Sequence, residues 1–157
     1  MALRIDDLAA HRALIPQIAQ WHFDLWRELT GFASFEEYSA HLHRCADGGA
    51  IPFVVIAFCD GKLAGSASVV VCDMPTRPDL TPWLAQVFVE PSARRQGIGA
   101  ALVRAAAARC ATLDVPVLYL FTSGELPAFY ARLGWQTREP ADYLGKPRTI
   151  MQLPLQA

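Results

Sequence analysis

The sequence predicts an α+β fold in which a mixed, mostly antiparallel central sheet is flanked by helices. Three observations lead to this prediction. A glycine turn joins two apolar, strand-like runs, one strand–helix–strand unit comes later, and a short helix precedes two more strand-like runs near the end. The tight turn predicts an antiparallel pair, whereas the strand–helix–strand unit predicts a parallel pair with a right-handed crossover.

The composition fits a single folded domain over residues 1–157. With 53% hydrophobic and 18% charged residues, a chain of this length can bury its own core. The formal net charge of −1 gives no reason to expect nucleic-acid binding. No apolar run is long enough to cross a bilayer, and the first residues lack the apolar stretch of a signal peptide. We therefore expect a soluble, cytoplasmic protein without nucleic-acid or membrane partners, and a homodimer is left open.

The cysteines and histidines do not predict a metal site. The four cysteines are scattered, without a Cys-x-x-Cys pair, so we expect free thiols in a reducing compartment. The segment His-x-His-x-Cys at residues 41–45 contains three metal-ligand side chains. Helical residues two apart point in different directions, so these side chains would not converge on one ion.

The first third of the chain predicts a short strand and two helices. Leu3 to Ile5 forms the strand-like run, and apolar residues recur at helical spacing over residues 14–29. Ser34, with Glu37 three residues later, has the pattern of a capping box. The second helix therefore extends from this box to about Arg44.

The central part predicts three strands. Pro52 to Cys59 is almost entirely apolar, which is typical of a strand buried on both faces. Asp60-Gly61 is a hairpin signal, so Lys62 to Cys72 is expected to return antiparallel to it. A proline-rich loop, Asp73 to Pro82, then leads into the strand Trp83 to Val89.

The remaining elements complete the strand–helix–strand unit and close the sheet. Apolar residues at helical spacing over residues 98–110 predict a helix, and Val117 to Phe121 predicts the strand after it. A short amphipathic helix over residues 126–133 is stopped by Gly134. The two closing strands are expected at Trp135 to Thr137 and at Arg148 to Leu153.

The loop before the helix at residues 98–110 has the features of a phosphate-binding loop. A helix start carries backbone N–H groups without intrahelical partners, and the positive end of the helix dipole favours an anion. Gly97 and Gly99 let a ligand approach the backbone, while Arg94 and Arg95 can add charge-assisted contacts. This combination predicts a phosphate-bearing ligand.

Two motifs extend this prediction to a family. The spacing Val-x-Val-x-Pro-x-x-Arg-x-x-Gly-x-Gly, from Val87 to Gly99, resembles the signature of the GCN5-related N-acetyltransferases. The segment Ala128 to Trp135 resembles that family's second landmark, Phe-Tyr-x-x-x-Gly followed by an aromatic residue. The order of elements also matches over almost the entire chain, so the resemblance implies the acyl-CoA N-acyltransferase fold.

The resemblance implies acetyl-CoA as co-substrate and no metal. The strand backbone would bind the pantetheine arm, and the glycine loop would hold the pyrophosphate. Ser123 stands where many members have an asparagine that helps to hold the cofactor. The implied cofactor-binding residues are Val87, Val89, Arg94, Arg95, Gln96, Gly97, Ile98, Gly99, Ala100 and Ser123.

The resemblance also implies a general acid but leaves the general base open. Tyr130 occupies the family's acid position, and a phenol with an ordinary pKa of about 10 keeps its proton at neutral pH. A backbone N–H of the strand that contains Val87 could stabilise the oxyanion. Trp83 occupies the position where some members have a glutamate base, so Asp73, Asp79, water or no dedicated base remain as alternatives.

The acceptor is expected to be a primary amine on a small molecule or a peptide. In this fold the acceptor pocket is shaped by the first two helices, the loop before Trp83 and the C-terminal segment. Aromatic and acidic residues there would suit a cationic amine with an apolar part. The alternative is a non-catalytic acyl-CoA sensor or interaction module of the same fold. The candidate lining residues are Trp21, His22, Trp26, Asp73, Asp79, Trp83 and Tyr143.

Overall fold

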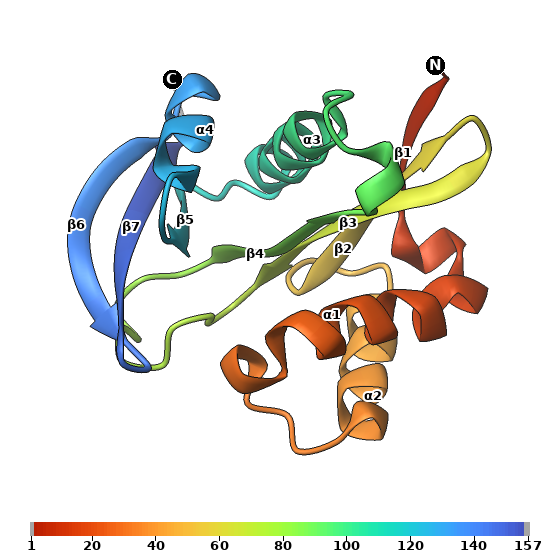
Figure 1. The fold of residues 1–157 in the computed structure, drawn as a ribbon, viewed down its shortest axis with the longest axis horizontal. Coiled ribbons are helices and arrows are strands. Elements are labelled where there is room, and N and C mark those ends of the chain that lie inside the picture. Colours follow the sequence, from red (N-terminus) through yellow and green to blue (C-terminus); the bar gives the residue numbers. More distant parts are fainter. Residues whose placement is uncertain (1, 156–157) are drawn as a thin grey trace.

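A computed structural model describes residues 2–155 and contains a seven-stranded sheet in the order β1-β2-β3-β4-β5-β7-β6 (Figure 1). All neighbouring strands are antiparallel except β4 and β5, which confirms the predicted α+β fold with a mixed sheet. The elements are β1 (Leu3–Asp7), α1 (Ile15–Thr30), α2 (Phe35–Cys45), β2 (Phe53–Cys59), β3 (Lys62–Val70), β4 (Trp83–Val89), α3 (Ile98–Thr112), β5 (Val117–Thr122), α4 (Leu126–Arg132), β6 (Gln136–Tyr143) and β7 (Lys146–Pro154).

Helices cover both faces of the central strands. In Figure 1, α1 and α2 lie on one side of β2 and β3, and α3 lies on the other. Val54 and Ile56 of β2 pack in the core beneath α1 and α2, whereas Val55 and Ala57 pack in the core beneath α3. Strand β2 is therefore buried on both faces, as its continuous apolar run predicts.

The capping box at the start of α2 forms as predicted. The Ser34 hydroxyl accepts a hydrogen bond from the backbone N–H of Glu37 at 3.1 Å. The Glu37 carboxylate in turn accepts one from the backbone N–H of Ala33, also at 3.1 Å. The first of these bonds satisfies a donor that the first turn of the helix leaves without a partner, and the second holds the residue before the N-cap against the helix start.

The closing strands are longer than predicted. β6 and β7 pair over nearly their whole length and are joined by a tight turn at Leu144 and Gly145, both of which have positive φ. β6 is an edge strand whose residues are mostly exposed, and it contains Pro140. Its polar sequence therefore lacks the apolar–polar alternation of a half-buried strand, which is why the sequence predicted only a short strand there. β3 ends at Val70 instead of Cys72, before the chain turns into the loop.

Strand β4 contains a bulge opposite β3. Ser66 and Ser68 of β3 pair with Phe88 and Ala85, so two residues of β4 face one residue of β3, and Gln86 has φ 48°. Past this irregularity β4 and β5 diverge (Figure 1). Their parallel pairing is limited to Trp83 and Tyr119 within the described residues.

Candidate active site

The divergence of β4 and β5 is accompanied by a groove of about 550 Å³. Its walls come from α1, the second half of β4, the loop that follows, the first turn of α3, and α4. Gln96 lies outside this groove and borders a different hollow near Cys59. Ser123 lines a neighbouring pocket instead. The predicted cofactor residues that line the groove are Val87, Val89, Arg94, Arg95, Gly97, Ile98, Gly99 and Ala100.

The N-terminus of α3 is open toward this groove. No side chain caps it, and its first turn contains no acidic residue. Gly97 has φ 79°, and no atom would lie within 4 Å of a Cβ built there, so the space beside its backbone is free. The Arg94 guanidinium donates to the Val89 carbonyl at 3.0 Å. Unpaired N–H groups, a free approach and nearby guanidinium groups suit the pyrophosphate of a nucleotide-bearing cofactor.

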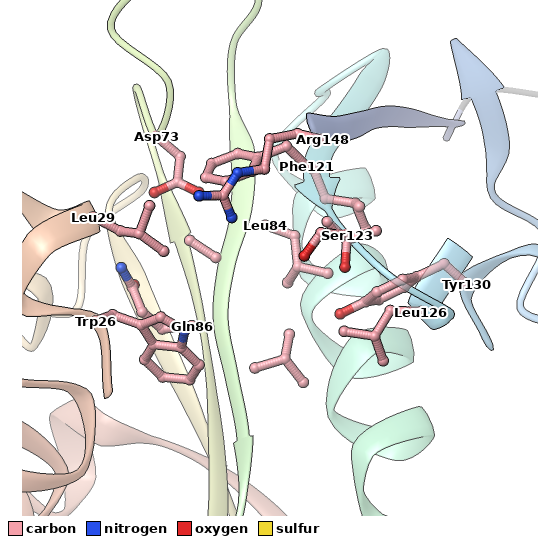
Figure 2. A pocket seen from close by; sticks show the side chains of 14 residues that line it. Trp26, Leu29, Asp73, Leu84, Gln86, Phe121, Ser123, Leu126, Tyr130 and Arg148 are labelled. Carbon is pink, nitrogen blue, oxygen red and sulfur yellow. The ribbon is translucent and has the colours of Figure 1, made fainter. Parts of the chain in front are cut away.

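A second, smaller pocket of about 180 Å³ lies beside the groove (Figure 2). It is lined by α1, the loop before β4, β4 itself, β5, the start of α4 and β7. Four residues line both spaces, so the two are adjacent along these side chains. The shared residues are Trp26, Val87, Leu126 and Tyr130.

Tyr130 lies in the wall that the two spaces share. It is 8% exposed and packs edge-on against Phe129 and Trp135. Figure 2 shows its hydroxyl pointing toward the pocket. Burial raises the pKa of Tyr130 to about 12, because a phenolate would lose hydration there. The hydroxyl therefore carries a proton at neutral pH.

The two candidate aspartates occupy different environments. Asp73 lines the smaller pocket, and burial raises the pKa of its carboxyl to about 7. Asp79 is exposed and forms an ion pair with Arg77 at 3.0 Å. Hydrogen bonds from Arg77 lower the pKa of Asp79 below its usual value. Asp73 therefore faces the smaller pocket, whereas Asp79 is held in its ion pair with Arg77.

Of the aromatic residues predicted to line the acceptor pocket, Trp26 lines the two spaces and the others do not. Trp26 lines both spaces and sits at a break in α1, where its φ and ψ of −128° and 19° depart from helical values. Trp21 packs against Phe88, and Trp83 and Tyr143 belong to a buried cluster. Trp21, Trp83 and Tyr143 do not line either space.

His22 is a core residue. It is fully buried, and its two ring nitrogens lie 2.7 Å from the Tyr38 hydroxyl and 2.8 Å from the Ser66 hydroxyl. Burial, with a smaller contribution from His41, lowers the pKa of His22 to about 3. The imidazole is therefore neutral at physiological pH and links α1, α2 and β3 through hydrogen bonds.

Gln86 and Arg148 are among the lining residues of the smaller pocket that the sequence did not mark. Gln86 reaches it because of the bulge in β4. Arg148 of β7 reaches it with its guanidinium 5.6 Å from the centre of the Phe121 ring, while its Nε donates to the Tyr143 carbonyl at 3.4 Å. The positions of both side chains in the pocket wall depend on strand pairing, so no local sequence pattern predicts them.

The segment at residues 41–45 adopts the predicted helix. The Cys45 Sγ lies 3.5 Å from the His41 Nε2, whereas His43 contacts Arg12. Within residues 2–155 no group of three or more histidine, cysteine or acidic side chains is arranged to hold a metal ion. The cysteines are free thiols. None of the described helices has the length and apolar character needed to span a membrane.

The sequence matches the profile of the Acetyltransferase (GNAT) family over residues 15–135. Because the match covers most of the chain, this protein belongs to that family of acetyltransferases, as its two motifs predict. No curated protein sequence matches it closely enough to be counted as a relative.

Solved structures share the fold over the full length. An N-acetyltransferase from Staphylococcus aureus Mu50 is 14% identical, with a TM-score of 0.77, and 99% of this chain and 100% of that one are covered. The protein yncA from Salmonella typhimurium, solved with its cofactor acetyl-CoA, is 17% identical, with a TM-score of 0.74 and coverage of 99% and 95%. A ribosomal-protein-alanine N-acetyltransferase from Brucella melitensis is 19% identical, with a TM-score of 0.73 and coverage of 99% and 100%.

Proposed function

We propose that this protein is an N-acetyltransferase that moves the acetyl group of acetyl-CoA to a primary amine of a small molecule or peptide. The observation that carries the proposal is the position of Tyr130 in the wall between the groove and the smaller pocket. A donor in the groove and an acceptor in the pocket would meet beside this hydroxyl.

The groove supplies the cofactor contacts. The open N-terminus of α3, with Arg94 and Arg95 beside it, would hold the pyrophosphate. The backbone of Val87 and Val89 would bind the pantetheine arm, and Ser123 would add a contact from the pocket side. When bound, acetyl-CoA supplies an acetyl group activated as a thioester. The cofactor of yncA from Salmonella typhimurium supports the choice of donor.

The chain's own groups supply the acid and base chemistry. The Tyr130 hydroxyl retains its proton at neutral pH and would donate it to the departing sulfur. A backbone N–H of β4 would stabilise the negative charge that develops on the acetyl oxygen. Asp73, with a pKa near 7 and a place in the pocket, is the better candidate than Asp79 to take a proton from the acceptor amine.

The direct test follows free thiol while the protein is incubated with acetyl-CoA and a broad panel of amines. Thermal shift first establishes cofactor binding, because a ligand at about 100 times its Kd stabilises the folded state by about 2.7 kcal/mol. Thiol release with at least one amine is expected. If protein that binds acetyl-CoA releases no thiol above buffer with any amine, the non-catalytic sensor becomes the better description.

Paired tyrosine substitutions test the role of the acid. Tyr130→Phe is expected to lower turnover at least about tenfold with little change in cofactor binding. Tyr119→Phe is the matched control, because Tyr119 lies on β5 but lines neither space. Equal turnover of wild type and Tyr130→Phe would show that the hydroxyl is not the general acid and that Tyr130 only packs in the core.

A further inference from the structure

The smaller pocket contains one acidic and one basic side chain among fourteen lining residues. Asp73 comes from the loop before β4, and Arg148 comes from β7. Figure 2 shows both side chains among those that line the pocket. The pocket therefore offers one basic group and one acidic group, and the acidic group has a pKa of about 7, so it can bind or release a proton near neutrality.

Neither charged group has an ionic partner among residues 2–155. Across residues 2–155 the ion pairs join other side chains, and Asp73 and Arg148 do not pair with each other. Asp73 receives no hydrogen bond from a described residue, and Arg148 makes a single long one, from Nε to the Tyr143 carbonyl. Asp73 and Arg148 are half-buried, and charges partly removed from water are normally paired, so this arrangement favours a ligand that supplies both missing partners.

The pocket is small, and apolar side chains line the rest of it together with the polar groups of Gln86, Thr122, Ser123 and Tyr130. Its volume of about 180 Å³ is below the roughly 300–1,000 Å³ of pockets that hold drug-sized ligands. A polycation would satisfy Asp73 but would place further positive charge beside Arg148, which disfavours it. The apolar side chains around the two charges are Trp26, Leu29, Leu84, Phe121 and Leu126.

We propose that the acceptor is a free amino acid with an apolar side chain, bound through its carboxylate to Arg148 and through its amino group to Asp73. This inference rests on the proposed function, because it names the acceptor of that reaction. The guanidinium can make two parallel hydrogen bonds to the carboxylate, and the apolar wall contacts the side chain.

The transfer balances with the groups present. The ammonium of the amino acid gives one proton to Asp73, and the neutral nitrogen forms a bond to the acetyl carbon. The carbon–sulfur bond breaks, and the thiolate takes the proton of Tyr130. The new amide nitrogen releases its second proton, which restores Tyr130, and Asp73 returns its proton to solvent. The products are an N-acetyl amino acid and free CoA.

The test uses a matched set of acceptors with acetyl-CoA: leucine, leucinamide, leucyl-glycinamide and 3-methylbutylamine. The last three lack a carboxylate beside the amine, so leucine is expected to show at least about a tenfold higher kcat/KM than each. Comparable rates with leucinamide, with leucyl-glycinamide or with the simple amine would overturn the inference but leave an active acetyltransferase.

A substitution of Arg148, with a matched substitution of an arginine outside the pocket, sharpens this test. Arg148→Gln is expected to raise the KM for leucine about tenfold or more and to leave the KM for leucinamide unchanged. Arg138→Gln is the control, because Arg138 lies on β6, pairs with Gln152 and does not line the pocket. If Arg148→Gln affects both acceptors equally, the guanidinium does not hold a carboxylate.

A binding measurement separates this inference from the proposed function. Leucine is titrated into the CoA-loaded protein and into its Arg148→Gln variant by calorimetry. Binding to the wild type that is lost in the variant supports the amino-acid site even if no thiol is released. Wild-type protein that releases thiol with other amines but does not bind leucine or the other apolar amino acids contradicts it.

Discussion

The raised pKa of Asp73 predicts how the stability of the protein depends on pH. The pKa rises from 3.8 to about 7 in the folded state, so the folded state binds the Asp73 proton more tightly than the unfolded state does. Between these values a rise in pH therefore removes stability. Three pKa units correspond to about 4 kcal/mol, which is an upper limit because water in the pocket solvates the carboxylate.

The substitution Asp73→Asn isolates this effect. Urea unfolding of wild type and variant is compared at about pH 5 and about pH 8, so that contributions shared by both proteins cancel in the difference. Between these pH values the wild type is expected to lose up to about 3 kcal/mol relative to the variant. Asp79→Asn is the control and should show no such difference between the two pH values, because Arg77 lowers the pKa of Asp79 and its carboxyl is ionised in the folded and unfolded states at both.

The reasoning is refuted if the difference in unfolding free energy between wild type and Asp73→Asn is the same at both pH values. The carboxyl would then titrate alike in the folded and unfolded states. In that case burial in the pocket would not perturb Asp73, and its candidacy as a base with a pKa near neutrality would lose its physical support.

Three further expectations address other parts of the fold. Gly65→Ala should destabilise the protein by about 1–3 kcal/mol in urea unfolding, because a Cβ there would lie 2.5 Å from the Phe88 carbonyl oxygen. Tyr38→Phe should cost about 1–3 kcal/mol by the same measurement, since it leaves the buried Nδ1 of His22 without a partner. His22 should contribute stability that is lost as pH falls from 6.5 toward 3, the window set by its lowered pKa, so the wild type should lose stability relative to His22→Gln over this range in thermal melts.

Local patterns were sufficient for much of the fold. The helix at residues 98–110, the capping box at Ser34 and the continuous apolar run of β2 depend on neighbours within a few residues, and each forms as predicted. The glycine loop is equally local, because a helix start provides its N–H groups wherever it occurs. These features could therefore be read without knowledge of the tertiary structure.

The acceptor pocket could be predicted only in part. Asp73 and Trp26 were candidates because of their chemistry, but Arg148 is far from both in the sequence and joins them only through the pairing of β7 with β5. The bulge that places Gln86 in the pocket depends on the register of β3 and β4. Such contacts arise from strand order, which no single segment encodes.

The divergence of β4 and β5 has a consequence for the cofactor-free protein. Beyond Trp83 and Tyr119 the two strands present backbone edges to each other inside a continuous sheet, and such edges readily recruit foreign strands. A bound pantetheine arm would lie between the two strands and occupy backbone hydrogen-bonding groups that are otherwise unpaired. Protein purified without CoA should therefore exchange the amide protons of β4 faster and aggregate more readily than protein kept saturated with it.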